Sequence, residues 1–254
     1  MKRIMSAFFA AALLLTVLCA CGNTTTTTVK EDVEEDSAFD VISTNKKETE
    51  KEEEDEGELE IVESGYTVMA PNSIGDIYLT YAITIKNNNK KMAVEFPSIT
   101  VTGRSESGSI LFSEEQTLGT ILPGDSVSWA DDAVDCKGET PVSVDIKVEG
   151  GDFVKPERSI NNTVPSSDFT IENLSEDPGE FDYAVTGEIT NNSDTDYDSV
   201  AVTVILKNQG KVVGGFTGYA DNLSAGKQSA FDISSFMSDL PAHDSIEVVA
   251  QGWM

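Results

Sequence analysis

The sequence predicts an all-β protein that contains two tandem β-sandwich domains. Apolar residues alternate with polar ones in several runs after residue 65, which is the period of a strand with one buried face. Turn-forming segments such as NNNKK, LPGDS and LSAGK separate these runs, and no amphipathic helix is evident. Similar blocks also recur about 102 to 104 residues apart, as expected for two copies of one domain.

The chain begins like an export signal that ends at a cysteine. Two basic residues precede an apolar run over residues 4–17, which leads into the motif LCAC. This motif resembles the lipobox of bacterial lipoproteins, to which Leu18, Ala20 and Cys21 correspond. The resemblance implies that the Cys21 thiol receives a diacylglyceryl group and that residues 1–20 are removed as the signal peptide.

Two other interpretations of this region stay open. The apolar stretch over residues 4–20 is just long enough for an uncleaved membrane-spanning helix, although Thr16 and the small residues at its end favour cleavage. Cys19 and Cys21 could also form a metal or redox pair. If Cys21 is lipidated and Cys19 removed, Cys136 has no partner for a disulfide, and we expect it to be a small buried apolar side chain.

Residues 21–64 are predicted to form a disordered acidic tether. They contain the segments KEDVEED and KKETEKEEEDEGELE, with few apolar residues and no periodicity. A solvated helix over residues 46–60 is the alternative, but like charges three and four residues apart oppose it. As a flexible coil the tether would span about 35 to 40 Å, and charge repulsion would extend it further.

The first sandwich domain is predicted over residues 65–150. Its clearest strand is an alternating run whose apolar members are Ile77, Leu79, Tyr81, Ile83 and Ile85. The segment GGDFVKPERSINNTVPSS supplies the predicted linker, residues 151–166. The second domain covers residues 167–254, and its strands include the alternating runs from Phe181 to Ile189 and from Val200 to Leu206. Short strands at this spacing, about seven in 80 to 90 residues, are typical of immunoglobulin-like sandwiches.

Three pairs of blocks carry the repeat. The stretch that starts at Tyr66 aligns with the stretch that starts at Phe169, and both end at paired asparagines. LGTILPGDSVSW then aligns with YADNLSAGKQSAF, and VSVDIKVEG aligns with DSIEVVAQG. A nearly constant offset over separate blocks indicates duplication of a whole domain.

The second copy resembles the FxLYD-type domains of bacterial surface lipoproteins. The segments that carry the resemblance are ITNNSD, VAVTVILKNQGKVVG and LSAGKQSAF. It covers residues 181–252 well and residues 77–150 more loosely, and residues 206–208 depart from the family's Tyr-Asp signature. The resemblance implies an immunoglobulin-like sandwich without catalytic residues.

Two motifs suggest enzymes or metal sites, and neither is complete. Gly124-Asp125-Ser126 resembles the nucleophile block of GDSL-type hydrolases, but His243 is the only available base and the second copy has SAGKQ in place of the serine turn.

Asp194, Asp196 and Asp198 have the alternate spacing of a calcium loop, yet Ser199 and Ile205 replace the glycine and the glutamate that such a loop requires. We interpret this segment as a solvated loop in which Tyr197 packs inward. Three further carboxylates, those of Asp131, Asp132 and Asp135, lie near Cys136 and form a weaker candidate. The triplets at Asn161, Asn173, Asn191 and Asn222 are interpreted as turn residues.

Charge and anchoring together define the expected function. The chain has 45 acidic and 17 basic residues and a formal net charge of −28, which excludes nucleic acid as an expected partner and opposes adhesion to anionic headgroups. Membrane lipid is therefore expected as a partner only through the acyl chains on Cys21, of which about two give stable anchoring. No cofactor, metal ion or catalytic residue is expected.

The leading hypothesis is a non-catalytic binding or spacer module at the bacterial envelope, whose protein or surface partner the sequence does not identify. The alternative is a solute- or ion-binding sensor lipoprotein, which requires a concave polar site between the domains. Filled cores with exposed loops favour the first hypothesis.

Overall fold

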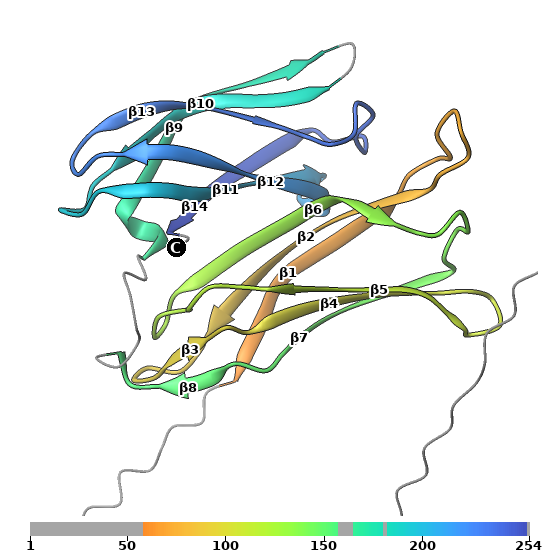
Figure 1. The fold of residues 1–254 in the computed structure, drawn as a ribbon, viewed down its shortest axis with the longest axis horizontal. Coiled ribbons are helices and arrows are strands. Elements are labelled where there is room, and N and C mark those ends of the chain that lie inside the picture. The colour runs from red at the N-terminus through yellow and green to blue at the C-terminus, as the bar shows by residue number, and fades with distance from the viewer. Residues whose placement is uncertain (1–57, 157–164, 180–181, 253–254) are drawn as a thin grey trace, which may run out of the picture. The chain divides into compact units, whose positions relative to one another are not determined.

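The computed structural model describes residues 58–156, 165–179 and 182–252, and nearly all of its elements are β-strands (Figure 1). The exception is a short 3-10 turn at Ser166–Asp168, immediately before the second half of the fold. The predicted all-β class is confirmed, and the strands form sandwich-like groups. Cys21 and the predicted signal peptide lie outside the described residues, as does most of the predicted tether.

Two facing sheets and a small strand pair make up the first half. The strands are β1 (Leu59–Val68), β2 (Tyr78–Asn87), β3 (Ala93–Glu95), β4 (Ser98–Arg104), β5 (Ile110–Thr117), β6 (Ser126–Asp135), β7 (Ser143–Glu149) and β8 (Asp152–Val154). One sheet has the order β1-β2-β6 and the other β5-β4-β7, and β3 pairs with β8. The five apolar residues of the predicted strand from Ile77 to Ile85 are all buried in the core between the two sheets.

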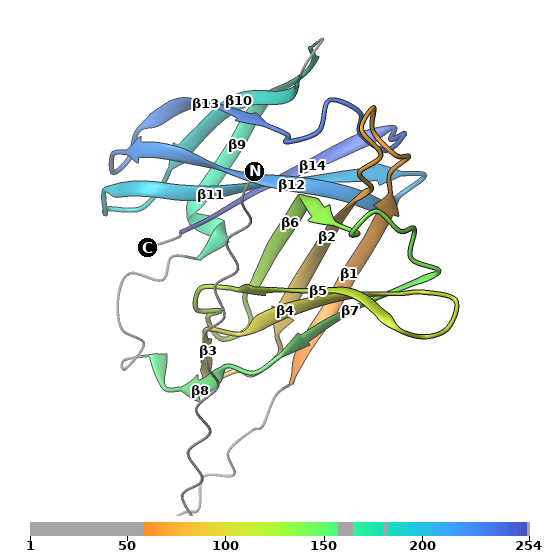
Figure 2. The same ribbon diagram turned by 45° about the vertical axis from the view of Figure 1, so that its right-hand side comes forward.

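The second half has the same arrangement of strands (Figure 2). Its strands are β9 (Phe169–Pro178), β10 (Tyr183–Asn191), β11 (Tyr197–Asn208), β12 (Lys211–Leu223), β13 (Gln228–Ser234) and β14 (Ser245–Gly252). One sheet has the order β9-β10-β13 and the other β12-β11-β14, so each sheet matches one in the first half strand for strand. A separate apolar core lies between these two sheets, and its members include Tyr183, Val202, Phe216 and Phe231.

The predicted start of the first domain is wrong by six residues. Strand β1 begins at Leu59, within the predicted tether, and pairs in antiparallel register with β2. Leu59 and Ile61 pack against the core, whereas Glu60 and the other alternate residues are exposed. Because Glu60 lies on the exposed face and the exposed Glu58 directly precedes the strand, the sequence around its start resembles the acidic segment before it.

This strand also corrects the alignment of the first repeated block. Leu59 lies opposite Asn87, and Phe169 lies opposite Asn191, so Leu59 and not Tyr66 is the counterpart of Phe169. The predicted linker is likewise too long at its start, because β8 lies inside residues 151–166 and extends the first half to Val154.

The prediction of one buried face is incomplete for the central strands β2 and β11. The opposite face of β2 buries Thr80 and Ala82, and that of β11 buries Ala201, Thr203 and Ile205. A third apolar cluster joins these faces, in which Ala82 and Ala130 of the first half contact Ile205 of the second. The sheets β1-β2-β6 and β12-β11-β14 therefore pack against each other, and we call this contact the joint.

Candidate functional site

The joint is rich in small and hydroxylated residues around Ile205. Thr80 Oγ1 donates a hydrogen bond to the carbonyl oxygen of Gly215 (2.9 Å) and accepts one from the Gly215 N–H (2.9 Å). Glycine is required at the closest approach, because a Cβ atom at Gly65 would lie 1.9 Å from the carbonyl oxygen of Val212. These contacts satisfy the polar groups that the joint buries.

A chain of hydrogen bonds crosses the middle of the joint. The backbone N–H of Ala130 donates to Thr217 Oγ1 (3.1 Å), the Thr217 and Thr203 hydroxyls are 3.1 Å apart, and Thr203 Oγ1 donates to the carbonyl oxygen of Ser128 (3.1 Å). The Ser128 N–H donates in turn to Gln251 Oε1 (3.2 Å). Directional contacts of this kind fix the register of the two sheets more narrowly than apolar packing alone.

A carboxylate extends the joint at one end. Asp132, which is 6% exposed, lies in β6, and its Oδ2 accepts hydrogen bonds from Ser235 Oγ (2.6 Å) and from the Met237 N–H (3.1 Å). These contacts hold the β13–β14 loop of the second half against the first half.

Beside this contact is a cleft of about 380 Å³, which we call the end cleft. The β1–β2 loop, the start of β2 and the β13–β14 loop form its walls. The lining residues are Met69, Ala70, Pro71, Asn72, Ile74, Asp76, Tyr78, Phe236, Met237, Ser238 and Asp239. Most are apolar, and the rings of Tyr78 and Phe236 meet edge to face with their centroids 5.6 Å apart.

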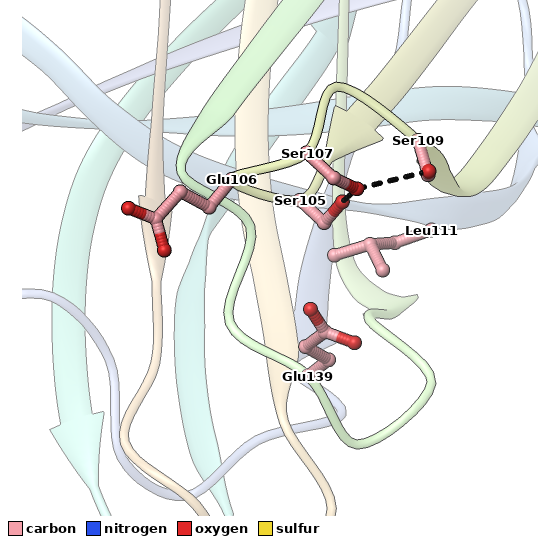
Figure 3. A pocket seen from close by; sticks show the side chains of 6 residues that line it. All are labelled: Ser105, Glu106, Ser107, Ser109, Leu111 and Glu139. Carbon is pink, nitrogen blue, oxygen red and sulfur yellow. Dashed lines mark hydrogen bonds between the residues drawn. The ribbon is translucent and has the colours of Figure 1, made fainter.

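A wider hollow of about 650 Å³ lies at the β4–β5 turn (Figure 3). Its serine hydroxyls bond to one another, with Ser105 Oγ 2.9 Å from Ser107 Oγ and Ser107 Oγ 3.0 Å from Ser109 Oγ. Figure 3 shows Glu106 to the left of this serine cluster and Glu139 below it. The hydroxyls are thus engaged within the turn itself.

A third hollow, of about 260 Å³, is acidic. Its lining residues include Tyr81, Glu114, Glu115, Asp131 and Asp135. Burial is the main cause that raises the pKa of Asp131, and nearby carboxylates add to it. Asp131 Oδ1 accepts a hydrogen bond from the Ala133 N–H (2.7 Å), and Asp135 pairs with Lys137. Within the described part of the chain, no group of three or more His, Cys, Asp or Glu side chains is arranged to hold a metal ion.

The hydrolase-like motif of the sequence has structural contacts. Asp125 Oδ1 accepts hydrogen bonds from the Ser126 N–H (2.8 Å) and from Ser166 Oγ (3.2 Å), which connects the second half to the turn before β6. His243 lies in the second half, where its Nε2 is 3.1 Å from the Tyr183 hydroxyl and 3.0 Å from Glu176 Oε2. The candidate base is therefore held in a cluster with these two side chains.

The calcium-like loop is also engaged in turn contacts. Asp196 Oδ1 accepts a hydrogen bond from the Ala225 N–H (2.8 Å), and Asp198 is exposed in β11. Tyr197 packs into the second core, as predicted. Cys136 is a free, fully buried thiol in the first core, also as predicted.

Asn191 differs from the other predicted turn residues, because its side chain is completely buried. Asn173 and Asn222 adopt positive φ angles within strands β9 and β12. Asn161 lies outside the described residues.

The residues of the end cleft were not identified from the sequence. Ile74 and Phe236 belong to loops without periodicity, and the two walls are far apart along the chain. A pair of isolated apolar residues in polar loops is the only sequence signal that marks them.

Comparisons with known proteins add no family. No family model matches the chain, and no curated protein matches it. The FxLYD resemblance therefore stays a prediction from the quoted motifs. Among the described residues, no helix has the length and apolar character needed to cross a membrane.

Proposed function

We propose that this protein is a lipid-anchored, non-catalytic binding module of the bacterial envelope. Cys21 carries the lipid, the acidic segment is a tether, and two repeated immunoglobulin-like sandwiches form the binding head. The matched strand orders of the two halves support the proposed repeat. The equivalent environments of Asn87 and Asn191 support it further. Asn87 donates hydrogen bonds to the carbonyl oxygens of Met92 and Ile121, and Asn191 donates to those of Thr195 and Leu223.

The observation that carries the proposal is the end cleft. Its walls belong to different halves, and the Asp132 contacts hold one wall in place. The two cores are filled by side chains, and the cleft loops carry the exposed large apolar side chains Ile74 and Phe236. Exposed apolar surface of this kind is typical of protein interaction sites.

The alternative, a solute- or ion-binding sensor, has less support. Such a sensor requires convergent polar groups between the halves, whereas that position holds the mostly apolar end cleft. The acidic hollow that Tyr81 lines lies within the first half, and its carboxylates are partly engaged by Ala133 and Lys137.

The anchor is tested by metabolic labelling with an alkyne fatty acid in cells that produce the full chain. Cys21→Ala is expected to abolish the label and leave an unprocessed precursor. Cys19→Ala serves as the matched control, which is expected to be labelled and processed normally. Mass spectrometry that found a free Cys21 thiol in the membrane fraction would contradict the proposed anchor. Surface cross-linking in the same cells tests binding, since a spacer alone would give no discrete cross-linked partner.

A further inference from the structure

The end cleft has the properties of a preformed docking site. Ile74 is 81% exposed and Phe236 is 65% exposed, although both are large apolar side chains at its mouth. Tyr78, which also lines the cleft, packs against the Phe236 ring and orients it. A partner that covered these side chains would remove apolar surface from water.

Hydrogen bonds hold both walls before any partner binds. Asn72 Oδ1 accepts from the N–H groups of Ile74 (3.0 Å) and Asp76 (2.9 Å), which closes the tip of the β1–β2 loop. On the other wall, the buried Asp132 carboxylate holds Ser235 and Met237. A site with ordered walls loses little conformational entropy on binding.

The charges at the cleft indicate which partner fits. Asp76 and Asp239 are the charged residues of its lining, and both are acidic. The whole chain carries a formal net charge of −28. A second copy docked cleft to cleft would bring four of these carboxylates together, and anionic lipid would be repelled in the same way.

We propose that the end cleft binds a segment of a partner protein in which apolar side chains are flanked by lysine or arginine. The apolar side chains pack against Ile74, Tyr78 and Phe236, and the basic groups pair with Asp76 and Asp239. This inference rests on the proposed binding function and adds to it the chemical class of the partner and the surface that receives it.

The test measures fluorescence anisotropy of a labelled peptide, KKLWLKK, with the full-length protein in phosphatidylcholine nanodiscs and with empty nanodiscs as background. The affinity for KKLWLKK is expected to exceed that for EELWLEE and for KKSSSKK by about tenfold or more. The comparison separates the contribution of charge from that of apolar contact, because EELWLEE reverses the charge and KKSSSKK removes the apolar side chains.

Variants of the protein locate the site. Phe236→Ser and Ile74→Ser are each expected to weaken KKLWLKK binding by about fivefold or more. The double change Asp76→Asn and Asp239→Asn should reduce the preference for KKLWLKK over EELWLEE. Val142→Ser is the matched control, since Val142 is 66% exposed and does not line the cleft. Circular dichroism melting identifies any variant that is not folded.

Several results would overturn the inference. These are equal binding of the lysine and glutamate peptides, binding to empty nanodiscs alone, and affinity unchanged by Phe236→Ser in a folded protein. Self-association that Phe236→Ser abolishes would assign the cleft to a second copy. Fatty-acid labelling separates this inference from the anchor, because a labelled protein without peptide binding refutes only the cleft proposal. Peptide binding by an unlabelled protein refutes only the anchor.

Discussion

Asn87 and Asn191 are fully buried side chains at the ends of β2 and β10, and they make matching contacts. Asn87 Nδ2 donates to the carbonyl oxygens of Met92 (2.8 Å) and Ile121 (3.1 Å), and Asn191 Nδ2 donates to those of Thr195 (2.8 Å) and Leu223 (3.1 Å). Each Oδ1 accepts from the N–H two residues later, at 3.0 Å in both cases. Each asparagine thus joins loops at one end of its sandwich.

Loss of either amide is expected to destabilise the fold. Asn87→Ala or Asn191→Ala removes these hydrogen bonds from a fully buried position and should lower the free energy of unfolding by about 1 to 3 kcal/mol in urea titrations. The neighbouring exposed residues provide the controls Asn88→Ala and Asn192→Ala, for which smaller losses are expected. Equal losses at the buried and exposed positions would contradict this role.

The Cys136 thiol gives a second prediction for a single residue. Burial raises its pKa to about 11, and Asp135 adds to the shift, so the reactive thiolate is scarce at neutral pH. Iodoacetamide at about pH 8 is expected to leave Cys136 unmodified in the native protein and to alkylate it in urea. Mass spectrometry of the Cys136 peptide measures this, and rapid native labelling would show that the first core opens readily.

Contacts between elements also depend on ionisation. Glu176 of β9 accepts a hydrogen bond from the Tyr183 hydroxyl of β10 and lies 3.0 Å from His243 Nε2 in the β13–β14 connection. The bond from Tyr183 is the main cause that lowers the pKa of Glu176, and His243 contributes to it. Burial and the Glu176 carboxylate raise the pKa of Tyr183. The cluster therefore favours an ionised Glu176 in the folded protein.

A carboxyl group whose pKa is lower in the folded protein than in the unfolded chain stabilises the fold at pH values above the unfolded pKa. This stabilisation is lost as the pH falls through the folded pKa. Between about pH 5 and pH 3, the free energy of unfolding should therefore fall more steeply in the wild type than in Glu176→Gln. Glu172→Gln is the control, because Glu172 is exposed on the same strand. Urea titrations across this range measure the difference, and parallel curves for wild type and Glu176→Gln would contradict the expected linkage.

At the scale of the whole molecule, the joint is expected to couple the two halves. Described residues of both halves belong to one compact unit, and Lys207 of β11 pairs with Glu63 of β1 at 3.0 Å. Thr67 Oγ1 also donates to the Val213 carbonyl oxygen at 2.6 Å. Strand β1 therefore contacts the second half from Glu63 to Thr67 while it completes a sheet of the first.

The change Gly65→Val tests this coupling. Its Cβ would lie 1.9 Å from the Val212 carbonyl oxygen, so the sheets of the joint must separate, and overpacking of this kind costs about 1 to 3 kcal/mol. Calorimetry is expected to show one unfolding transition for the wild type and two for Gly65→Val. Gly119→Ala is the control, because a Cβ at Gly119 meets nothing within 4 Å. Two transitions in the wild type would show that the halves unfold independently.

The joint also shows where sequence reasoning fails. The apolar face of β2 was predictable because Ile83 and its neighbours alternate with smaller residues. Thr80 and Ala82 on its other face resemble a solvent-facing surface, since small side chains such as threonine and alanine occur both on exposed faces and in close contacts between sheets. The partners of Thr80 lie more than a hundred residues later, at Gly215. Sequence periodicity reports that a face is not strongly apolar, but it does not report what covers that face.

The end cleft was unpredictable for a related reason. Ile74 and Phe236 are isolated apolar residues in separate loops, and each alone is ordinary for a surface. The packing of the two halves brings their loops to one place, through contacts that include those of Asp132 with the β13–β14 loop. The acidic start of β1 is the opposite case, because its alternation is present in the sequence but glutamates mask it.

The position of β1 has a mechanical consequence. A pull on the chain at Leu59 acts along the axis of this strand, and the end cleft begins at Met69, just beyond the strand's other end. A partner held by Phe236 and Asp239, on the cleft wall that belongs to the second half, would therefore load the contacts of β1 with β2 and with the second half in shear, so that they resist together and do not open one at a time. Traction between the proposed anchor and a partner bound in this way would then be carried by the strand that both sandwiches hold.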